Sequence, residues 1–301
     1  MAATPATRHV TCLCDTWSAR NATREMAEPR QLANPPITEA VIDIRAGFSA
    51  SRSIDDLASI AGRLAGYTET SRQHFSFSVI PGTGGMPLNL PPGLQAVGAA
   101  ASTPPAGPAA TAAAAAPQMA PMIQFGVSYI SQNRLEVIQS RRDGLTFSRL
   151  RPYLDWGPLF DGAWEAWLAY RDCVRPDRIL RVSTRFLNRI EIPAGRDLDE
   201  YFVISPKMPE RAPNFLLGYS SALSIPFPDL GVQATVRLTM NASSVDNRTV
   251  QPLILDLDIL FPCDFGPTDD TAIRRSISAL RPIKNDLFFG SLTETAMELF
   301  Q

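Results

Sequence analysis

The residues best placed to do chemistry are arginines and aspartates that recur at every second position of predicted strands. Alternate side chains of a strand point to the same face, so in segment 178–192 Arg181 and Arg185 share one side. Guanidinium groups bind carboxylates and phosphates through paired hydrogen bonds. The candidate binding residues of this kind are Arg181, Arg185, Arg189, Arg237, Asp256 and Asp258.

Three interpretations of this set stay open. The first is structural: arginines and carboxylates pair across strands on a solvated sheet face, each exposed pair contributing up to about 1 kcal/mol. The second is a mixed-charge surface that binds a ligand or partner. The third is an acid/base or metal site that uses Asp256 and Asp258, although two carboxylates lack the third ligand that a divalent cation needs.

Histidine and cysteine are too scarce for most other chemistry. The chain has two histidines, His9 and His74, and four cysteines. His9, Cys12, Cys14 and Asp15 are of metal-ligating type, but no second cluster follows them, and structural zinc sites take paired clusters. No phosphate-binding loop or nucleophile motif is present. We therefore predict no catalytic residues, no metal and no cofactor, while the sequence leaves enzymatic activity formally open.

Composition narrows the class of protein further. The chain has 301 residues, a formal net charge of −2, and 26 arginines among its 28 basic residues. A net charge near zero disfavours a nucleic-acid binder, which is usually basic. No apolar run approaches the length that spans a bilayer, and the first residues lack a signal core. We expect a cytoplasmic protein that does not contact a membrane.

Three regions differ in composition. Residues 1–31 show no periodicity and are interpreted as a flexible extension. Residues 81–122 hold 13 Ala, 9 Pro, 6 Gly and no charged residue, which is typical of a disordered insertion. The remainder divides into a first half, 32–176, which contains the insertion, and a second half, 177–301.

Both halves predict the same order of elements. A half-buried strand over 40–48 precedes a helix capped by Ser53, strands near 74–80, 122–131, 134–142 and 145–151, and a long helix that ends at Pro176. The second half predicts a strand over 178–192 and a helix opened by an Asp197/Glu200 capping box. Strands near 215–225, 232–241 and 252–261 follow, then a helix after Thr268 and a last helix capped by Ser291.

This order predicts an α+β fold in which an internally duplicated unit packs its helices on one face of antiparallel sheet. The opposite face is then polar and carries the candidate residues. The sequence does not show whether the two halves share one continuous sheet.

Four segments carry a resemblance to a known family. They are LANPPITEAVIDIR (32–45), RDGLTFSR (142–149), RFLNRI (185–190) and FFGSLT (288–293), which together span about residues 32 to 301. In this order they resemble a sporadically distributed family of uncharacterised bacterial proteins. The resemblance implies a protein of similar length and brings no activity, cofactor or catalytic residue with it. The insertion and the N-terminal extension depart from the family pattern.

The function that the sequence favours is non-enzymatic binding or protein interaction through the mixed-charge sheet face. The partner is an unidentified protein or a small anionic ligand, and a homo-oligomer is left open. One alternative is a nucleic-acid-binding protein in which Arg181, Arg185 and Arg189 contact phosphates. The other is a carboxylate- or metal-dependent hydrolase that uses Asp256 and Asp258.

Overall fold

The computed structural model describes residues 32–75, 123–209, 211, 216, 218–240 and 249–301. In the first half the elements are β1 (Ile37–Gly47), α2 (Ile54–Ala58), β2 (Tyr67–Phe75), β3 (Ile123–Ser131), β4 (Glu136–Arg141), β5 (Gly144–Leu150) and α3 (Trp156–Val174). In the second half they are β6 (Arg178–Pro193), β7 (Tyr219–Phe227), β8 (Val232–Met240), β9 (Val250–Phe265), α4 (Asp270–Ser291) and α5 (Glu294–Glu298). The predicted extension 1–31 and insertion 81–122 lie outside the described residues.

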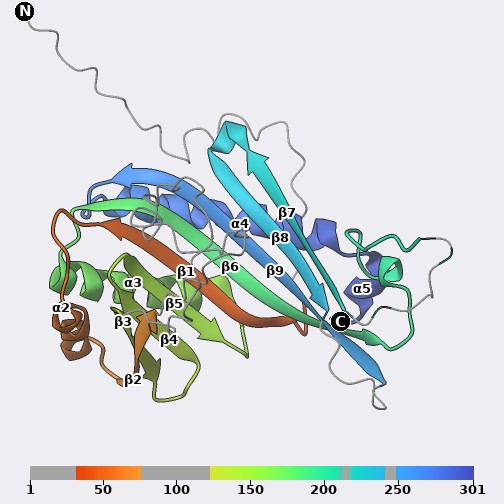
Figure 1. Cartoon of the computed structure of the whole chain (residues 1–301), viewed down its shortest axis with the longest axis horizontal. Helices are drawn as coiled ribbons and strands as arrows, with labels where there is room; N and C mark the ends of the chain where they lie inside the picture. Colours follow the sequence, from red (N-terminus) through yellow and green to blue (C-terminus); the bar gives the residue numbers. More distant parts are fainter. Residues whose placement is uncertain (1–31, 76–122, 210, 212–215, 217, 241–248) are drawn as a thin grey trace, which may run out of the picture.

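One sheet contains all nine strands, in the order β2-β3-β4-β5-β1-β6-β9-β8-β7 (Figure 1). Every neighbouring pair is antiparallel. The two halves meet where β1 pairs with β6, with Asp43 opposite Ser183. This answers the question that the sequence left open: the halves share a continuous sheet.

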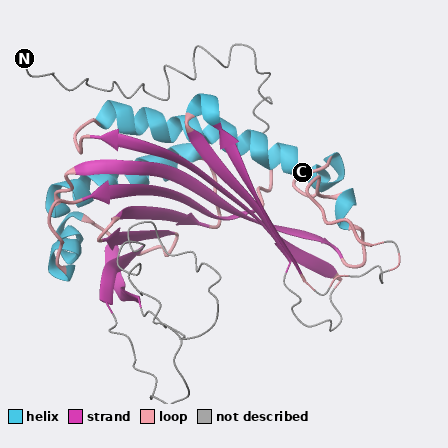
Figure 2. Cartoon of the chain, turned by 45° about the horizontal axis from the view of Figure 1, so that its top comes forward, coloured by secondary structure: helices cyan, strands magenta, loops and turns pink. Residues whose placement is uncertain are grey.

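The long helices α3 and α4 cover one face of this sheet (Figure 2). Alternate residues of the central strands supply the core beneath them, among them Ile42 and Ile44 of β1 and Phe186 of β6, all at most 2% exposed. On α4, Ile277 and Leu280 face the sheet and are equally buried. The predicted α+β class, with helices on one face of antiparallel sheet, is therefore confirmed.

The start of the first half differs from the prediction in its boundaries. Ser53 caps α2 as predicted, accepting a hydrogen bond from the Asp56 N–H in a capping box. The α-helix ends at Ala58 and continues as a 3-10 turn to Arg63, so Leu64 and Ile60 are buried while Ala61 is exposed. The next strand begins at Tyr67 rather than near residue 74.

Two predicted helix caps are wrong. Asp197 makes no capping bond, and only a single 3-10 turn forms over Leu198–Glu200. The chain beyond it pairs with the C-terminal region instead, because Phe202 bridges to Leu292. Thr293, not Ser291, caps α5, since Ser291 is still helical and its hydroxyl donates to the Leu287 carbonyl.

No helix in the described part of the chain combines the length and the apolar character needed to cross a membrane.

Candidate binding surface on the polar sheet face

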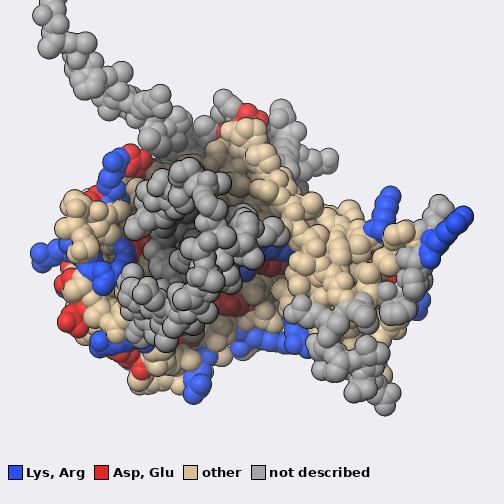
Figure 3. Space-filling model, viewed as in Figure 1, with Lys and Arg blue, Asp and Glu red and all other residues tan. Residues whose placement is uncertain are grey.

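The face of the sheet opposite α3 and α4 carries a band of charged side chains across its central strands. Cross-strand register aligns Arg45 with Arg181, and Val41 with Arg185 and then Asp258. We call the following residues the polar sheet face: Asp43, Arg45, Arg141, Asp143, Arg181, Arg185, Arg237, Asp256 and Asp258. The view in Figure 3 shows basic and acidic atoms interspersed over the β1–β5 side and mostly uncharged surface toward β7 and β8.

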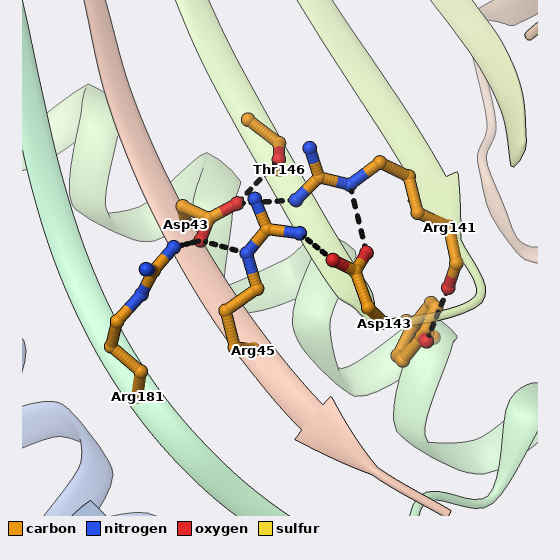
Figure 4. A network of polar contacts seen from close by, with 7 residues as sticks. Asp43, Arg45, Arg141, Asp143, Thr146 and Arg181 are labelled. Carbon is orange, nitrogen blue, oxygen red and sulfur yellow. Dashed lines mark hydrogen bonds and ion pairs between the residues drawn. The ribbon is translucent and has the colours of Figure 1, made fainter. Parts of the chain in front are cut away.

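Asp43 of β1 is the centre of a first cluster (Figure 4). Its Oδ1 accepts hydrogen bonds from Arg141 Nη2 at 2.6 Å and from Thr146 Oγ1 at 2.7 Å. Its Oδ2 accepts from Arg45 Nε at 2.9 Å and from Arg181 Nη2 at 3.3 Å. One buried carboxylate thus holds arginines from β1, β4 and β6.

Asp143, in the turn between β4 and β5, adds a second carboxylate to this cluster. It accepts a hydrogen bond from Arg45 Nη1 and lies 3.4 Å from Arg141 Nε. The backbone of Arg141 is held from the other side of the sheet, where the Tyr170 hydroxyl of α3 donates to its carbonyl at 2.7 Å. The cluster therefore contains three guanidinium groups and two carboxylates.

The electrostatics of Asp43 follow from this crowding. Burial alone would raise the pKa of its carboxyl. Attraction from Arg141 and Arg45, the Thr146 hydrogen bond and the Arg181 charge outweigh that effect and hold the pKa below its usual value. Asp43 is consequently ionised over the whole physiological range.

A second cluster lies toward β8. Asp256 of β9 accepts hydrogen bonds from Arg185 Nε at 2.8 Å and Nη2 at 2.7 Å, in the bidentate geometry that guanidinium groups favour. Arg237 Nη1 lies 3.3 Å from the same carboxylate. The Asp256 side chain is 8% exposed, whereas those of Arg185 and Arg237 are 46% and 35% exposed. The two arginines thus present free guanidinium edges above a buried carboxylate.

Asp258 of β9 differs from Asp256, two residues before it, in its contacts. Within the described residues its carboxylate forms no hydrogen bond or ion pair, although Arg185 is directly opposite it in register. Burial raises its pKa, and the Asp256 charge adds to this while Arg185 opposes it. Burial and the neighbouring Asp256 charge therefore oppose the ionisation of Asp258.

The structure brings together five of the six predicted residues. Arg181 joins the Asp43 cluster, Arg185, Arg237 and Asp256 form the second cluster, and Asp258 lies beside it. Arg189 lies farther along β6 and pairs with Glu191 of its own strand, at 2.9 Å. The candidates named from the sequence did not include Asp43, Arg45, Arg141 or Asp143. Arg141 and Asp143 lie at the connection between the predicted strands 134–142 and 145–151, which the structure places beside β1.

The arrangement can recognise anions more readily than it can do acid/base chemistry. Two of the carboxylates, Asp43 and Asp256, are each bound to more than one arginine. Among the described residues, no three His, Cys, Asp or Glu side chains are grouped closely enough to hold a metal ion.

Comparisons with protein-family models, with curated proteins and with solved structures give no match for this chain.

Proposed function

We propose that this protein is a non-enzymatic binding protein whose polar sheet face recognises an acidic segment of a partner protein. One observation carries the proposal: guanidinium donors on this face outnumber the carboxylates that accept from them. Five arginines converge there on Asp43, Asp143 and Asp256, while Asp258 makes no pair within the described residues.

The surplus is visible at individual atoms. Arg181 Nε is buried and has no hydrogen-bond acceptor in the described part of the chain, whereas Arg141 Nε faces Asp143 Oδ1 at 3.4 Å. Buried donors are usually paired, so such atoms need an explanation. Arg185 engages Asp256 through Nε and Nη2 and keeps Nη1 for another acceptor. Carboxylates of an acidic peptide would match these donors.

The shape of the surface favours a macromolecular partner. The clusters are spread over strands β1, β4, β6, β8 and β9, and the two cavities described for this molecule are lined by other residues. A broad face with exposed arginine edges suits an extended segment better than it suits a small molecule.

The experiment is a binding titration with a poly-glutamate peptide across a range of salt concentrations. We expect binding that weakens as salt rises, because the contacts are between partly exposed charges. Arg185→Lys combined with Arg237→Lys keeps the charge but removes the bidentate geometry. This double variant should bind at least fivefold more weakly.

Arg178→Gln is the matched control, because Arg178 lies at the start of the same strand and pairs with Asp264, outside the two clusters. It should bind like the wild type. A parallel titration with duplex DNA tests the nucleic-acid alternative. The proposal is wrong if the wild type does not bind the peptide at about 50 mM salt, or if the double variant binds it with unchanged affinity. It is also wrong if the protein binds DNA but not the peptide.

We also propose that the two halves derive from duplication of one α+β unit. Each half begins with a long central strand, and the last strand of each half lies next to its first, as β5 does to β1 and β9 to β6. Each half then continues into a long helix, α3 or α4. A superposition of residues 37–174 on 178–291 that fails to align these elements would contradict the duplication.

Membership in the bacterial family that the sequence resembles, a cytoplasmic location and self-association also stay proposals. The sheet offers a second copy its edge strands β2 and β7. Light scattering across a range of protein concentrations tests self-association.

A further inference from the structure

A cavity of about 400 Å³ lies on the helix side of the sheet. The segment before β1, the loop into α3, strand β6 and the second half of α4 all contribute to its lining. It is thus separate from the polar sheet face, which is on the other side of the sheet. Its size is at the small end of the range that ligand pockets occupy.

Aromatic side chains form much of the wall. Tyr153 and Trp156 line the cavity and pack against the fully buried Phe186 of β6, the Tyr153 ring edge-on at 5.7 Å and the Trp156 ring stacked at 6.5 Å. Phe288 and Phe289 of α4 complete the apolar lining. Such walls bind the apolar body of a ligand.

Two cations face this cavity from α4, one turn apart. Lys284 Nζ lies 4.5 Å from the centre of the Phe186 ring, and the Arg281 guanidinium lies 5.8 Å from that of Trp156. In the described part of the chain, neither forms a salt bridge or a hydrogen bond. The carboxylate that lines the cavity, Asp155, caps α3 by accepting from the Gly157 N–H at 2.8 Å.

The electrostatic environment of Lys284 indicates that its ammonium group lacks a negatively charged partner in the described part of the chain. Burial, with the Arg281 charge as a second cause, lowers the pKa of Lys284 to about 8. The α3 N-terminus opens onto the same space, where the Asp155 carboxylate offsets the positive end of the helix dipole. Cation–π contact with Phe186 offsets part of the cost of burying the ammonium group. A bound anion would offset far more, because it would interact with both cations.

We propose that this cavity binds a small organic anion, a carboxylate on an aromatic or other apolar body. The carboxylate lies between Lys284 and Arg281, and the body packs against Trp156, Tyr153 and Phe288. This site is independent of the polar sheet face, so either proposal can fail without the other.

The test uses 2-naphthoate as the probe and the full chain. The sequence contains only two lysines, Lys284 and Lys207, and Lys207 lies beside a different cavity. Mass spectrometry can therefore follow the acetylation of each lysine by acetic anhydride at pH 8. Saturating 2-naphthoate should slow the modification of Lys284 at least fivefold and leave Lys207 unchanged.

Calorimetric titration of variants supplies the second measurement. Arg281→Gln and Lys284→Met should each weaken 2-naphthoate binding at least tenfold, while Lys207→Met should bind like the wild type. Arg281→Gln should also abolish the protection of Lys284 at the same probe concentration. The thermal unfolding of each variant is recorded, so that loss of binding is scored only on folded protein.

Three results would overturn the proposal. The first is that 2-naphthoate protects both lysines equally from acetylation, or protects neither of them. Another is unchanged affinity in the two cavity variants. The last is binding of inorganic phosphate with the same protection, which would show that the apolar body does not contribute to recognition.

Discussion

Arg185 binds the carboxylate diagonal to it, Asp256, rather than Asp258, which is directly opposite in the β6–β9 register. Diagonal neighbours are within reach of a long side chain. Asp256 lies opposite Arg237 on β8, so the diagonal contact with Arg185 allows one buried carboxylate to bind two arginines. The consequence is an asymmetry: two aspartates on one strand face have different charge environments.

This asymmetry predicts different effects for two identical substitutions. Asp256→Asn should lower the free energy of unfolding by about 2 kcal/mol, because it leaves two guanidinium groups without their carboxylate. The exposure of both arginines keeps the loss below that of a fully buried pair. Asp258→Asn should be neutral or slightly stabilising, since its burial opposes ionisation. Urea denaturation at pH 7 measures both, and a larger loss at Asp258 would contradict the arrangement described here.

Alternation along the strands was sufficient to predict which side chains share the polar face. Arg181, Arg185, Asp256 and Asp258 are placed as the period-2 pattern requires, because a strand between a core and solvent has only one register that buries its apolar side. Which arginine meets which carboxylate was not predictable. That depends on the order of strands in the sheet, and the sequence did not show that β1 and β6 are neighbours.

Asp43 predicts an acid-sensitive contribution to stability. Its pKa is lower in the folded state than in the unfolded chain, so this contribution is complete above the ordinary carboxyl value of 3.8 and is lost as the pH falls through the folded value. Asp43→Asn should cost about 3 kcal/mol at pH 7, because the buried arginines lose their acceptor. Chemical denaturation from pH 7 to pH 2 measures the difference.

The wild type and Asp43→Asn should converge in stability toward the acid end of that series. Asp229→Asn is the control, because Asp229 lies in the turn before β8, away from this cluster. A constant gap between the wild type and Asp43→Asn at every pH would contradict the assignment.

Two helical glycines predict opposite responses to alanine. A Cβ on Gly162 of α3 would lie 2.5 Å from Cζ of Phe147, a fully buried ring of β5. Gly162→Ala should therefore destabilise the fold by about 1–3 kcal/mol, as overpacking does. Gly290 of α4 has no heavy atom within 4 Å of such a Cβ, so Gly290→Ala should stabilise by up to about 1 kcal/mol. Thermal unfolding of the pair tests how closely α3 packs on the sheet.

The cavity beside Lys284 was beyond what the sequence could predict. On α4, Lys284 continues the helical spacing of the apolar residues Ile273, Ile277 and Leu280, so the period alone places it on the face that packs against the sheet. Its surroundings come from segments far apart in the chain, with Phe186 on β6 and Trp156 on α3. The packing of α3 and α4 on the sheet, which the sequence does not show, brings these aromatic neighbours to Lys284.

Lys284 predicts a stability that rises with pH. The folded protein releases the Lys284 proton near pH 8, whereas the unfolded chain holds it to about 10.5. Between these values the unfolded state binds more protons, so this group's contribution to the free energy of unfolding increases by about 3 kcal/mol in total. Lys284→Met removes the buried charge, so it should stabilise the protein at pH 7 by about 1–3 kcal/mol.

The difference in the free energy of unfolding between Lys284→Met and the wild type should decrease as the pH rises from 8 toward 10.5. Comparing the two proteins at each pH cancels the titration of other groups, such as Cys263, whose pKa burial raises to about 12. Arg281 on α4, Tyr153 and Asp155 are the charged or titratable groups that line the same cavity, and the substitution leaves them in place. If Lys284→Met is destabilising at pH 7, or if its difference from the wild type does not change with pH, Lys284 is not a buried, unpaired ammonium group.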